Sequence, residues 1–347
     1  MLAGLRDSAV EAFRVLLVER RLPHSWARRW HDLRYKEALE KTLREAASVN
    51  PIPSSNMPLA ELHVVTCSRD LFMAILAVKS LIRFTDQLAV VFHGDRSLDE
   101  AGARKLKEKI PGCRVILLNE ADEEAAKHPE ISRLREALPE RFRLASGYEN
   151  QRSAWALKVF DFHLFCQCDR IIVLDSDTLF LQRPDELIEF IEGRQPCGFY
   201  AVPRLRNLKM PDQLILDYFP QANVIPRFNG GLFGFDRTQM PVSLLRDITE
   251  KVINSPEIVI MGDECLWRFF FAHRDAAPLA FDRYPLTTDT GRSKELAKSL
   301  HEVVYIHFIL KHKGGFYQKM AEKVGTDLRR YNHDSAPGRK PLLKGCQ

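Results

Sequence analysis

The sequence lacks the patterns that mark several large classes of protein. No apolar run approaches the roughly 20 residues that a membrane-spanning helix needs. The first residues lack the charged start and the unbroken apolar stretch of a standard signal peptide. The formal net charge of the 347 residues is +5, but no long block carries charges of one sign, so an arm that binds nucleic acid is not indicated.

Paired cysteines and glycine-rich phosphate loops are also missing. The seven cysteines are scattered, odd in number and free of any CxxC pair, which argues against both a disulfide framework and a zinc knuckle. No GxGxxG follows the first predicted strand and no GxxxxGK[ST] occurs, so a dinucleotide site and a P-loop are poorly supported. These absences predict a cytoplasmic protein with reduced thiols.

A linker rich in turn-forming residues, 50–58, divides the chain. We predict a helical N-terminal arm and linker over residues 1–58, a main domain over 59–330 and a flexible tail over 331–347. The arm has a break at Pro23 and apolar stripes at helical spacing. Because it is mildly basic and contains tryptophans, it can either pack on the main domain, which we favour, or contact a membrane surface peripherally.

From residue 61 onward, strand-like apolar runs alternate with helical patterns. The β-α-β-α-β order over residues 62–118 predicts a parallel sheet with right-handed crossovers. Further helices are predicted over 119–143, 153–165, 242–253 and 264–272, and further strands over 171–174, 198–202, 231–235 and 303–306. The sequence therefore predicts an α/β fold with a Rossmann-like, mostly parallel sheet flanked by helices.

The strongest chemical signal is an aspartate pair at the end of an apolar strand. Ile171–Leu174 is typical of a strand buried on both faces, and Asp175 and Asp177 follow it. Side chains two apart on an extended chain point the same way, and close carboxylates commonly share a divalent cation. Because ligands of open α/β sheets bind beyond the carboxyl ends of the strands, we predict a metal site that holds nucleotide phosphates. The alternative is a simple turn, with either aspartate capping a helix near Pro184.

A second polar group follows another apolar strand near the end of the chain. His307 comes directly after Val303–Ile306, and an imidazole there can complete a carboxylate site for a cation such as Mn²⁺. Lys311 and Lys313, next to two glycines, are candidates for contact with phosphate oxygens. The alternative is an isolated histidine at a strand exit, followed by a solvated basic turn.

Three other segments carry side chains suited to a sugar or a nucleotide. Asn229 and Gly230 interrupt an aromatic run and offer an amide beside open backbone, although Asn-Gly more often forms a hairpin turn. Asp263 and Glu264 begin a predicted helix, where an aspartate can simply be the N-cap. Lys158 lies in an otherwise apolar helix and either extends to the surface or holds a carboxylate or hydroxyl in a cleft.

Taken in chain order, these segments resemble the motifs of GT-A glycosyltransferases of family 8, the glycogenin and lipopolysaccharide galactosyltransferase-like family. The resemblance covers residues 61–315 and depends on the following segments: Thr66, Ser68 and Phe72 at the first strand, Lys158, Asp175-Ser-Asp177, Phe228-Asn-Gly-Gly231, Gly262-Asp-Glu264, and His307 with Lys313. Two positions depart from the family pattern. Glu264 stands where the family has glutamine, and the segment after His307 differs, so Lys311, His312 and Lys313 all remain candidates for the phosphate-binding residue.

The resemblance implies a metal-dependent hexosyltransferase of the EC 2.4 type. The donor would be a nucleotide diphosphate sugar, UDP-glucose or UDP-galactose, and the sugar would be transferred with retention to a glycan, lipid or protein acceptor that the sequence does not identify. The resemblance implies Mn²⁺ or Mg²⁺ held by Asp175, Asp177 and His307. It assigns catalysis to Asp263, Glu264 and Lys158, and donor binding to Thr66, Ser68, Phe72, Asp175, Asn229, Gly230, Lys311 and Lys313.

Two other functions compete with this interpretation. A phosphohydrolase of the haloacid dehalogenase type also has Asp-x-Asp after an apolar strand. It requires Thr or Val where this chain has Leu179, and it usually carries the motif on its first strand. The second rival is a non-catalytic protein that binds a sugar nucleotide, but the acids, His307 and Lys158 are all present, so nothing in the sequence indicates lost activity.

Overall fold

A seven-stranded sheet forms the centre of the molecule. The computed structural model describes residues 24–141, 152–195, 197–203, 215–217, 220–225, 227–255, 263–272, 275–287, 299–308 and 315–331. In spatial order the strands of the sheet are β3 (Arg114–Ile116), β2 (Leu88–Gly94), β1 (Ala60–Thr66), β4 (Arg170–Leu174), β7 (Asn229–Asp236), β6 (Gly198–Ala201) and β8 (Ala276–Pro278). Most neighbouring strands are parallel, and β7 is antiparallel to both β4 and β6. The predicted α/β class with a mostly parallel sheet is confirmed.

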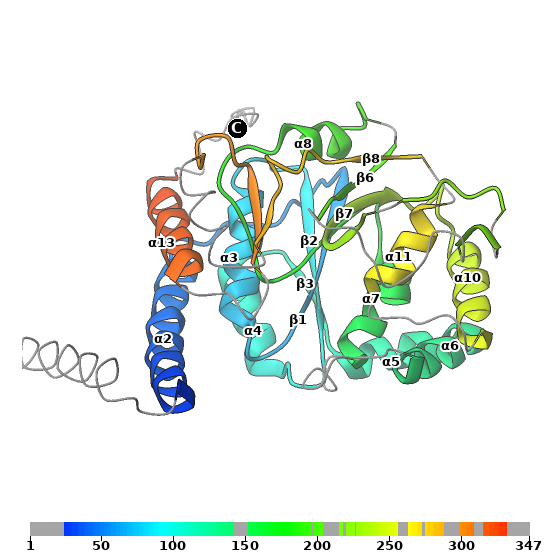
Figure 1. The fold of residues 1–347 in the computed structure, drawn as a ribbon, viewed down its shortest axis with the longest axis horizontal. Coiled ribbons are helices and arrows are strands. Elements are labelled where there is room, and N and C mark those ends of the chain that lie inside the picture. The colour runs from blue at the N-terminus through cyan, green and yellow to red at the C-terminus, as the bar shows by residue number, and fades with distance from the viewer. Residues whose placement is uncertain are drawn as a thin grey trace, which may run out of the picture.

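Helices cover both faces of this sheet (Figure 1). One layer consists of α2 (His24–Ala47), α3 (Leu71–Ile82), α4 (Glu100–Lys109) and α13 (Gly315–Arg330). The other consists of α5 (Leu118–Ala126), α6 (Pro129–Arg141), α7 (Arg152–Phe165), α10 (Val242–Asn254) and α11 (Asp263–Phe271). Strand β4 contributes Ile172 to the first core and Ile171 to the second, and both side chains are fully buried. This confirms the prediction of a strand buried on both faces.

A small second sheet lies beside the first and carries His307. Its strands are β5 (Thr178–Phe180), β10 (Tyr305–Phe308) and β9 (Leu286–Thr287), with β10 antiparallel to β5 and parallel to β9. The predicted strand 303–306 is therefore displaced by two residues, and His307 lies inside the strand rather than at its exit. The difference arises because β10 takes its register from β5 and β9, which are distant in sequence.

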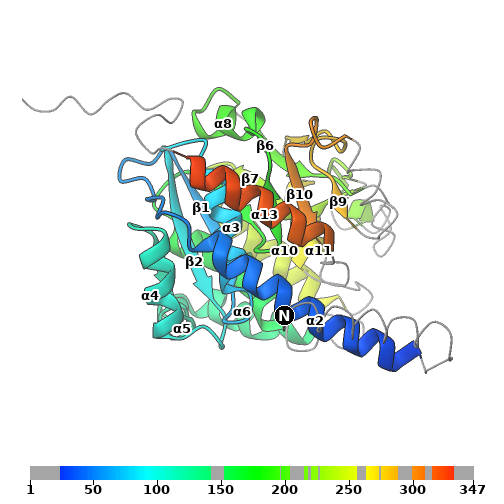
Figure 2. The same ribbon diagram turned by 90° about the vertical axis from the view of Figure 1, so that its left-hand side faces the viewer.

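The described part of the N-terminal arm packs on the main domain. Helix α2 runs beside α13 (Figures 1 and 2), and Leu43, Ala46 and Ala47 on α2 are buried. A Cβ added to Gly325 of α13 would lie 2.8 Å from the Ala46 Cβ, so the two helices approach each other closely. The favoured interpretation, that the arm packs on the main domain, holds for the end of α2, whereas residues 1–23 of the arm lie outside the described residues.

A buried lysine anchors the end of this arm. The Lys79 ammonium, on α3, is fully buried and donates hydrogen bonds of 2.6–3.1 Å to three main-chain carbonyls at and beyond the end of α2, those of Ala47, Val49 and Asn50. These carbonyls have no partner within the helix, so the ammonium satisfies them. None of the described helices is long and apolar enough to cross a membrane.

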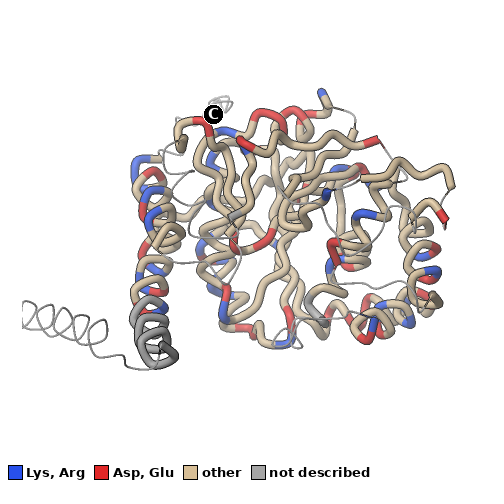
Figure 3. The backbone as a smooth tube through the Cα atoms, in the orientation of Figure 1, with Lys and Arg blue, Asp and Glu red and all other residues tan. Residues whose placement is uncertain are grey.

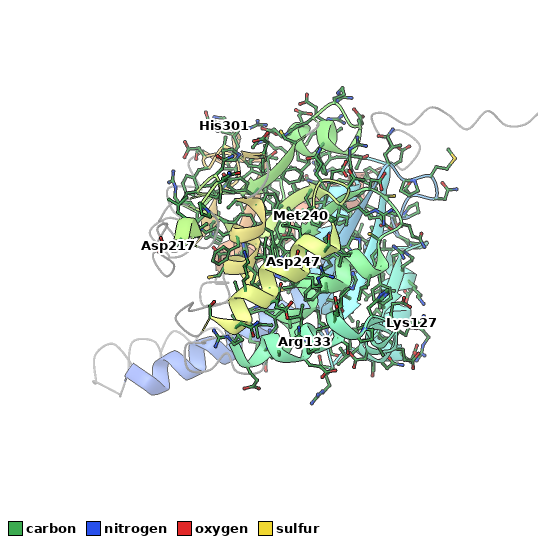
Figure 4. All side chains as sticks on the ribbon, turned by 90° about the vertical axis from the view of Figure 1, so that its right-hand side faces the viewer. Lys127, Arg133, Asp217, Met240, Asp247 and His301 are labelled. Atoms are coloured by element: carbon green, nitrogen blue, oxygen red, sulfur yellow. The ribbon has the colours of Figure 1, made fainter. Side chains whose placement is uncertain are left out.

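The charged residues lie mainly on the outer helices, with both signs interspersed (Figure 3). Ion pairs of 2.6 Å between Arg133 and Glu250 and of 2.9 Å between Arg246 and Glu130 join α6 to α10, which cross on the face shown in Figure 4. Exposed pairs of this kind stabilise a fold only slightly. The arrangement agrees with the absence of a charge block from the sequence.

Protonation of buried His163 should destabilise the protein in acid. Burial lowers the pKa of His163 to about 4, and its Nε2 donates to the Met240 carbonyl at 2.8 Å. The unfolded chain takes up this proton first as the pH falls, because an exposed histidine has a pKa of about 6.5. Between pH 6.5 and 5, His163 should therefore lower the free energy of unfolding by about 2 kcal/mol.

Urea unfolding at both pH values measures this effect. The variant His163→Phe should lose about 2 kcal/mol less stability than the wild type over that interval. The matched control is His301→Gln, since His301 is exposed and labelled at the surface in Figure 4. Equal pH dependence in His163→Phe and the wild type would contradict the assignment.

Candidate active site

The aspartate pair occupies a tight turn between the two sheets. Asp175 follows β4, and its main-chain N–H donates to the Gly231 carbonyl of β7 at 3.0 Å. The Thr178 hydroxyl, at the start of β5, donates to the Asp175 carbonyl at 2.8 Å. The next helix, α8 (Asp185–Ile191), has Pro184 at its N-cap and no side-chain cap. The alternative in which either aspartate caps that helix is therefore wrong.

The three predicted metal ligands lie together in the structure. The His307 Nε2 is 3.2 Å from the Asp177 Oδ1 and 3.8 Å from the Asp175 Oδ2. A ligand atom from each of the three residues lies within 4.8 Å of the other two. The pairing of β10 with β5 positions the histidine, and the Phe308 N–H donates to the Asp177 carbonyl at 2.8 Å.

This set of donors suits a divalent cation. Two carboxylates and one imidazole converge from a strand-end turn and a paired strand, so their positions are set by main-chain hydrogen bonds. Carboxylate oxygens together with phosphate oxygens favour Mg²⁺ or Mn²⁺, and an imidazole ligand suits the softer Mn²⁺. The residues present therefore fit the cation that the sequence predicts.

Lys158 connects the metal end of the site to the start of α11. Its ammonium lies 2.5 Å from the Asp175 Oδ1 and 3.4 Å from the Asp263 Oδ2. Burial by itself would lower the pKa of Lys158, but the charges of Asp175 and Asp263 raise it above its ordinary value, so the lysine stays protonated. Lys158 is only 7% exposed, so the alternative of a lysine that extends to the surface is wrong.

Burial also affects the partner carboxylate. It raises the pKa of Asp263 above its ordinary value, and the Lys158 ammonium opposes that rise. Asp263 begins α11 and lies 5% exposed, with its carboxylate directed at the lysine rather than at solvent. The start of the helix thus contributes an acid to the site, beyond any capping role.

Asn229 and Gly230 begin a central strand rather than a hairpin turn. Both belong to β7, which pairs with β4 and β6, so the hairpin alternative is wrong. The Asn229 Oδ1 accepts hydrogen bonds from the Gly231 N–H at 2.8 Å and from the His307 Nδ1 at 3.0 Å. A Cβ on Gly230 would lie 3.5 Å from the Asp263 Oδ2 and 3.6 Å from the Glu264 Cβ. The start of β7 therefore faces the start of α11.

The residues predicted to receive the nucleoside lie at the end of β1 and just after it. Thr66 is buried there, and its hydroxyl has no hydrogen-bond partner among the described residues. The Ser68 N–H, in contrast, has a partner: it donates to the Ser97 hydroxyl at 3.1 Å. This hydrogen bond joins the loop after β1 to the loop after β2. Thr66 ends β1, which pairs with β4, and Ser68 follows two residues later, at the end of the sheet that carries the acids.

The Phe72 ring lies near cations of two neighbouring helices. The Arg44 guanidinium of α2 and the Lys105 ammonium of α4 each lie 5.3 Å from the centre of its ring. The aromatic ring is thus engaged by two cations of neighbouring helices, and its role beside a nucleobase stays a prediction. Lys311, His312 and Lys313 lie outside the described residues, as does Gly262.

The structure adds Tyr305 to the site, a residue that sequence reasoning missed. Its hydroxyl donates to the Gly231 carbonyl at 3.2 Å. Burial raises the pKa of Tyr305 well above its ordinary value, with a further contribution from the charges of Asp175 and Asp177, so it stays a neutral donor. The signal was its position two residues before His307, because alternate residues of a strand face the same side.

Gly231 leaves the space in which the His307 ring lies. A Cβ at this position would be 2.3 Å from the His307 Nδ1, closer than any real contact, so the imidazole would have to move. We expect Gly231→Ala to weaken Mn²⁺ binding at least about tenfold, as loss of ligand positioning does. Electron paramagnetic resonance of free Mn²⁺ during titration measures this affinity.

Gly234→Ala is the matched control for this prediction. It lies on the same strand, and its Cβ would be 2.4 Å from the Phe199 ring, a comparable collision within the core. It should lower the melting temperature and leave the Mn²⁺ affinity at the wild-type value. If the two variants bind Mn²⁺ equally well, His307 is not held by the space at Gly231.

Comparison with solved structures identifies proteins of similar fold. No protein-family model and no curated protein sequence matches the chain. The structure of galactosyltransferase LgtC with donor and acceptor sugar analogs is similar, with a TM-score of 0.51 and 12% identity over 77% of this chain and 95% of that one. The bifunctional glycosyltransferase WbbM is also similar, with a TM-score of 0.51 and 13% identity over 82% of this chain, which spans 53% of WbbM. The protein has the GT-A fold.

Proposed function

We propose that the protein is a metal-dependent glycosyltransferase that moves a hexose from a nucleotide diphosphate sugar to an acceptor. The observation that carries the proposal is the convergence of Asp175, Asp177 and His307 beyond the end of β4 on a GT-A fold. LgtC, which shares this fold, is described as a galactosyltransferase. The proposed donor is UDP-glucose or UDP-galactose, and the proposed outcome is retention at the anomeric carbon.

Asp177 and His307 hold the cation, with Asp175 shared between cation and ribose. The difficult event in such a transfer is departure of a diphosphate, and a Mn²⁺ or Mg²⁺ ion bound here supplies positive charge for the diphosphate oxygens. Lys311 or Lys313, in the segment after β10, is the proposed second source of positive charge. Thr66 and Ser68, at the end of β1, receive the nucleoside.

The proposed position of the hexose is between the acid pair and α11. Asp263 and Glu264 lie beside Gly230, where the absent side chain lets a sugar approach the main chain. The Asn229 Nδ2 is buried without a hydrogen-bond partner among the described residues, which supports its proposed role as a donor to a sugar or phosphate oxygen. Lys158 aligns Asp175 and Asp263, because its ammonium lies between them.

A thermal-shift panel tests the proposal directly. UDP, GDP, UDP-glucose and UDP-galactose are compared, each with and without Mn²⁺. A ligand that binds only the folded protein increases the free energy of unfolding by RT ln(1 + [L]/Kd), about 2.7 kcal/mol at 100 times Kd. The melting temperature rises as a result. We expect the uridine nucleotides to raise it only when Mn²⁺ is present.

The rival functions predict other results. Release of inorganic phosphate from simple esters, without a preference among nucleotides, would favour a phosphohydrolase. Binding of UDP without hydrolysis or transfer of any sugar donor would favour a non-catalytic binding protein. Mn²⁺-dependent hydrolysis of UDP-glucose or UDP-galactose, the slow side reaction with water, would support the transferase.

A further inference from the structure

We propose that Asn229 is a positioning residue that keeps the proton of the His307 ring on Nδ1 and thereby presents Nε2 to the cation. The inference rests on the proposed function and extends it to a residue that need not touch the metal. A histidine has two ring nitrogens, and which of them binds a metal is set by the hydrogen bond that the other one makes. In this site that other bond goes to an amide.

The orientation of the Asn229 amide is determined by a main-chain donor. An amide oxygen and nitrogen are hard to tell apart by shape alone, so their assignment depends on the hydrogen-bond network. The Gly231 N–H can only donate, and it lies 2.8 Å from the Asn229 Oδ1. The atom that faces Gly231 must therefore be the oxygen.

The same oxygen receives the bond from the histidine. It lies 3.0 Å from the His307 Nδ1, and a carbonyl oxygen cannot donate, so Nδ1 carries a hydrogen. The opposite nitrogen, Nε2, points at the carboxylates and lies 3.2 Å from the Asp177 Oδ1. A hydrogen at Nε2 is thus the one that a cation replaces, while the hydrogen at Nδ1 stays in place.

The surroundings of Gly231 make this arrangement rigid. The Gly231 carbonyl accepts hydrogen bonds from the Asp175 N–H at 3.0 Å and from the Tyr305 hydroxyl at 3.2 Å. These two bonds hold the main chain of Gly231 in its orientation. The His307 ring lies against the same residue, where a Cβ would be 2.3 Å from Nδ1. Ring, amide and main chain therefore hold one another in a single orientation.

Two variants separate positioning from simple structural support. Asn229→Asp keeps an oxygen that accepts from both Gly231 and His307, whereas Asn229→Ala removes it. We expect Asn229→Ala to bind Mn²⁺ about 10–100-fold more weakly, measured by paramagnetic resonance on the nucleotide-free protein. Asn229→Asp should match or exceed the wild-type affinity, because its added negative charge attracts the cation. Equal Mn²⁺ affinity in the wild type and a folded Asn229→Ala would overturn the inference.

The proton position can be read without any variant at Asn229. Nitrogen-15 correlation spectra of the histidine rings, with excess Mg²⁺, should show His307 with a hydrogen on Nδ1 and none on Nε2. The His307 signals are assigned by their loss in His307→Asn. A hydrogen on Nε2 in the Mg²⁺-loaded protein would overturn the inference even if Asn229→Ala fails to fold.

Failure of this inference differs from failure of the proposed function. If the wild type shows no Mn²⁺ site that Asp177→Ala removes, the metal-dependent function itself is wrong. If that site exists and is insensitive to Asn229→Ala, only the role assigned to Asn229 is wrong.

Discussion

Replacing Asp177 with alanine should reduce Mn²⁺-dependent hydrolysis of UDP-glucose by about 10²–10³-fold, the range seen when a group that stabilises charge in a transition state is removed. The Asp177 Oδ1 is 3.2 Å from the His307 Nε2, at the point where the three predicted ligands converge. The variant therefore removes one of the three residues that would hold the cation. Mn²⁺ affinity should fall together with the rate. Release of UDP at saturating Mn²⁺ measures the rate.

Asp185→Ala makes the same chemical change away from the site. Asp185 begins α8, is 63% exposed and forms an ion pair of 2.9 Å with Arg183. This variant should hydrolyse UDP-glucose at the wild-type rate. Unchanged metal-dependent hydrolysis in Asp177→Ala would remove the central claim about the site, whatever the behaviour of the control.

Replacing Lys158 with methionine should have the largest effect on stability. The ammonium lies between Asp175 and Asp263, at 2.5 and 3.4 Å, and methionine fills similar space without the charge. Removing one partner of a buried ion pair costs about 3–5 kcal/mol, because the remaining charge is left without compensation. Urea unfolding at pH 7.5 measures the change, and hydrolysis of the donor should be lost as well.

A double variant tests whether the loss of stability in Lys158→Met comes from the Asp263 carboxylate, which is left without its cation. Asp263→Asn removes the buried charge that Lys158 compensates, so the pair Lys158→Met and Asp263→Asn should be more stable than the sum of the single changes indicates. Activity should not return. Lys127→Met is the surface control: Lys127, labelled in Figure 4, forms an exposed pair with Glu124, and its loss should cost less than about 1 kcal/mol. Strict additivity of the two buried changes would show that the pair is not coupled.

The elements that the sequence predicted well are those with a local signature. The apolar run Ile171–Leu174 is buried on both faces because nothing polar interrupts it, and the acids after it lie at the carboxyl edge of the sheet, as expected for an open α/β fold. The helices α7, α10 and α11 begin and end within two residues of their predicted bounds. Hydrophobic periodicity over ten or more residues is sufficient to locate such helices.

The elements that the sequence did not predict are short or depend on partners. Strands β5 and β9 have three and two residues, too few for any periodicity, and they exist because β10 pairs with both. Helix α13 was not predicted either, although it covers α2 and α3. Phe72 shows the same limit, since its ring neighbours Arg44 and Lys105 come from two other helices.

By itself the sequence determined the fold class, the strand that carries the acid pair, and which residue types converge on a cation. It could do so because alternation, burial and strand-end polarity are properties of short segments. Only the tertiary structure decided that His307 meets Asp177, that Lys158 lies between two buried carboxylates, and that Asn229 contacts the imidazole. Those contacts join segments distant in the chain, and the register that brings them together is set by pairing and packing across the whole domain.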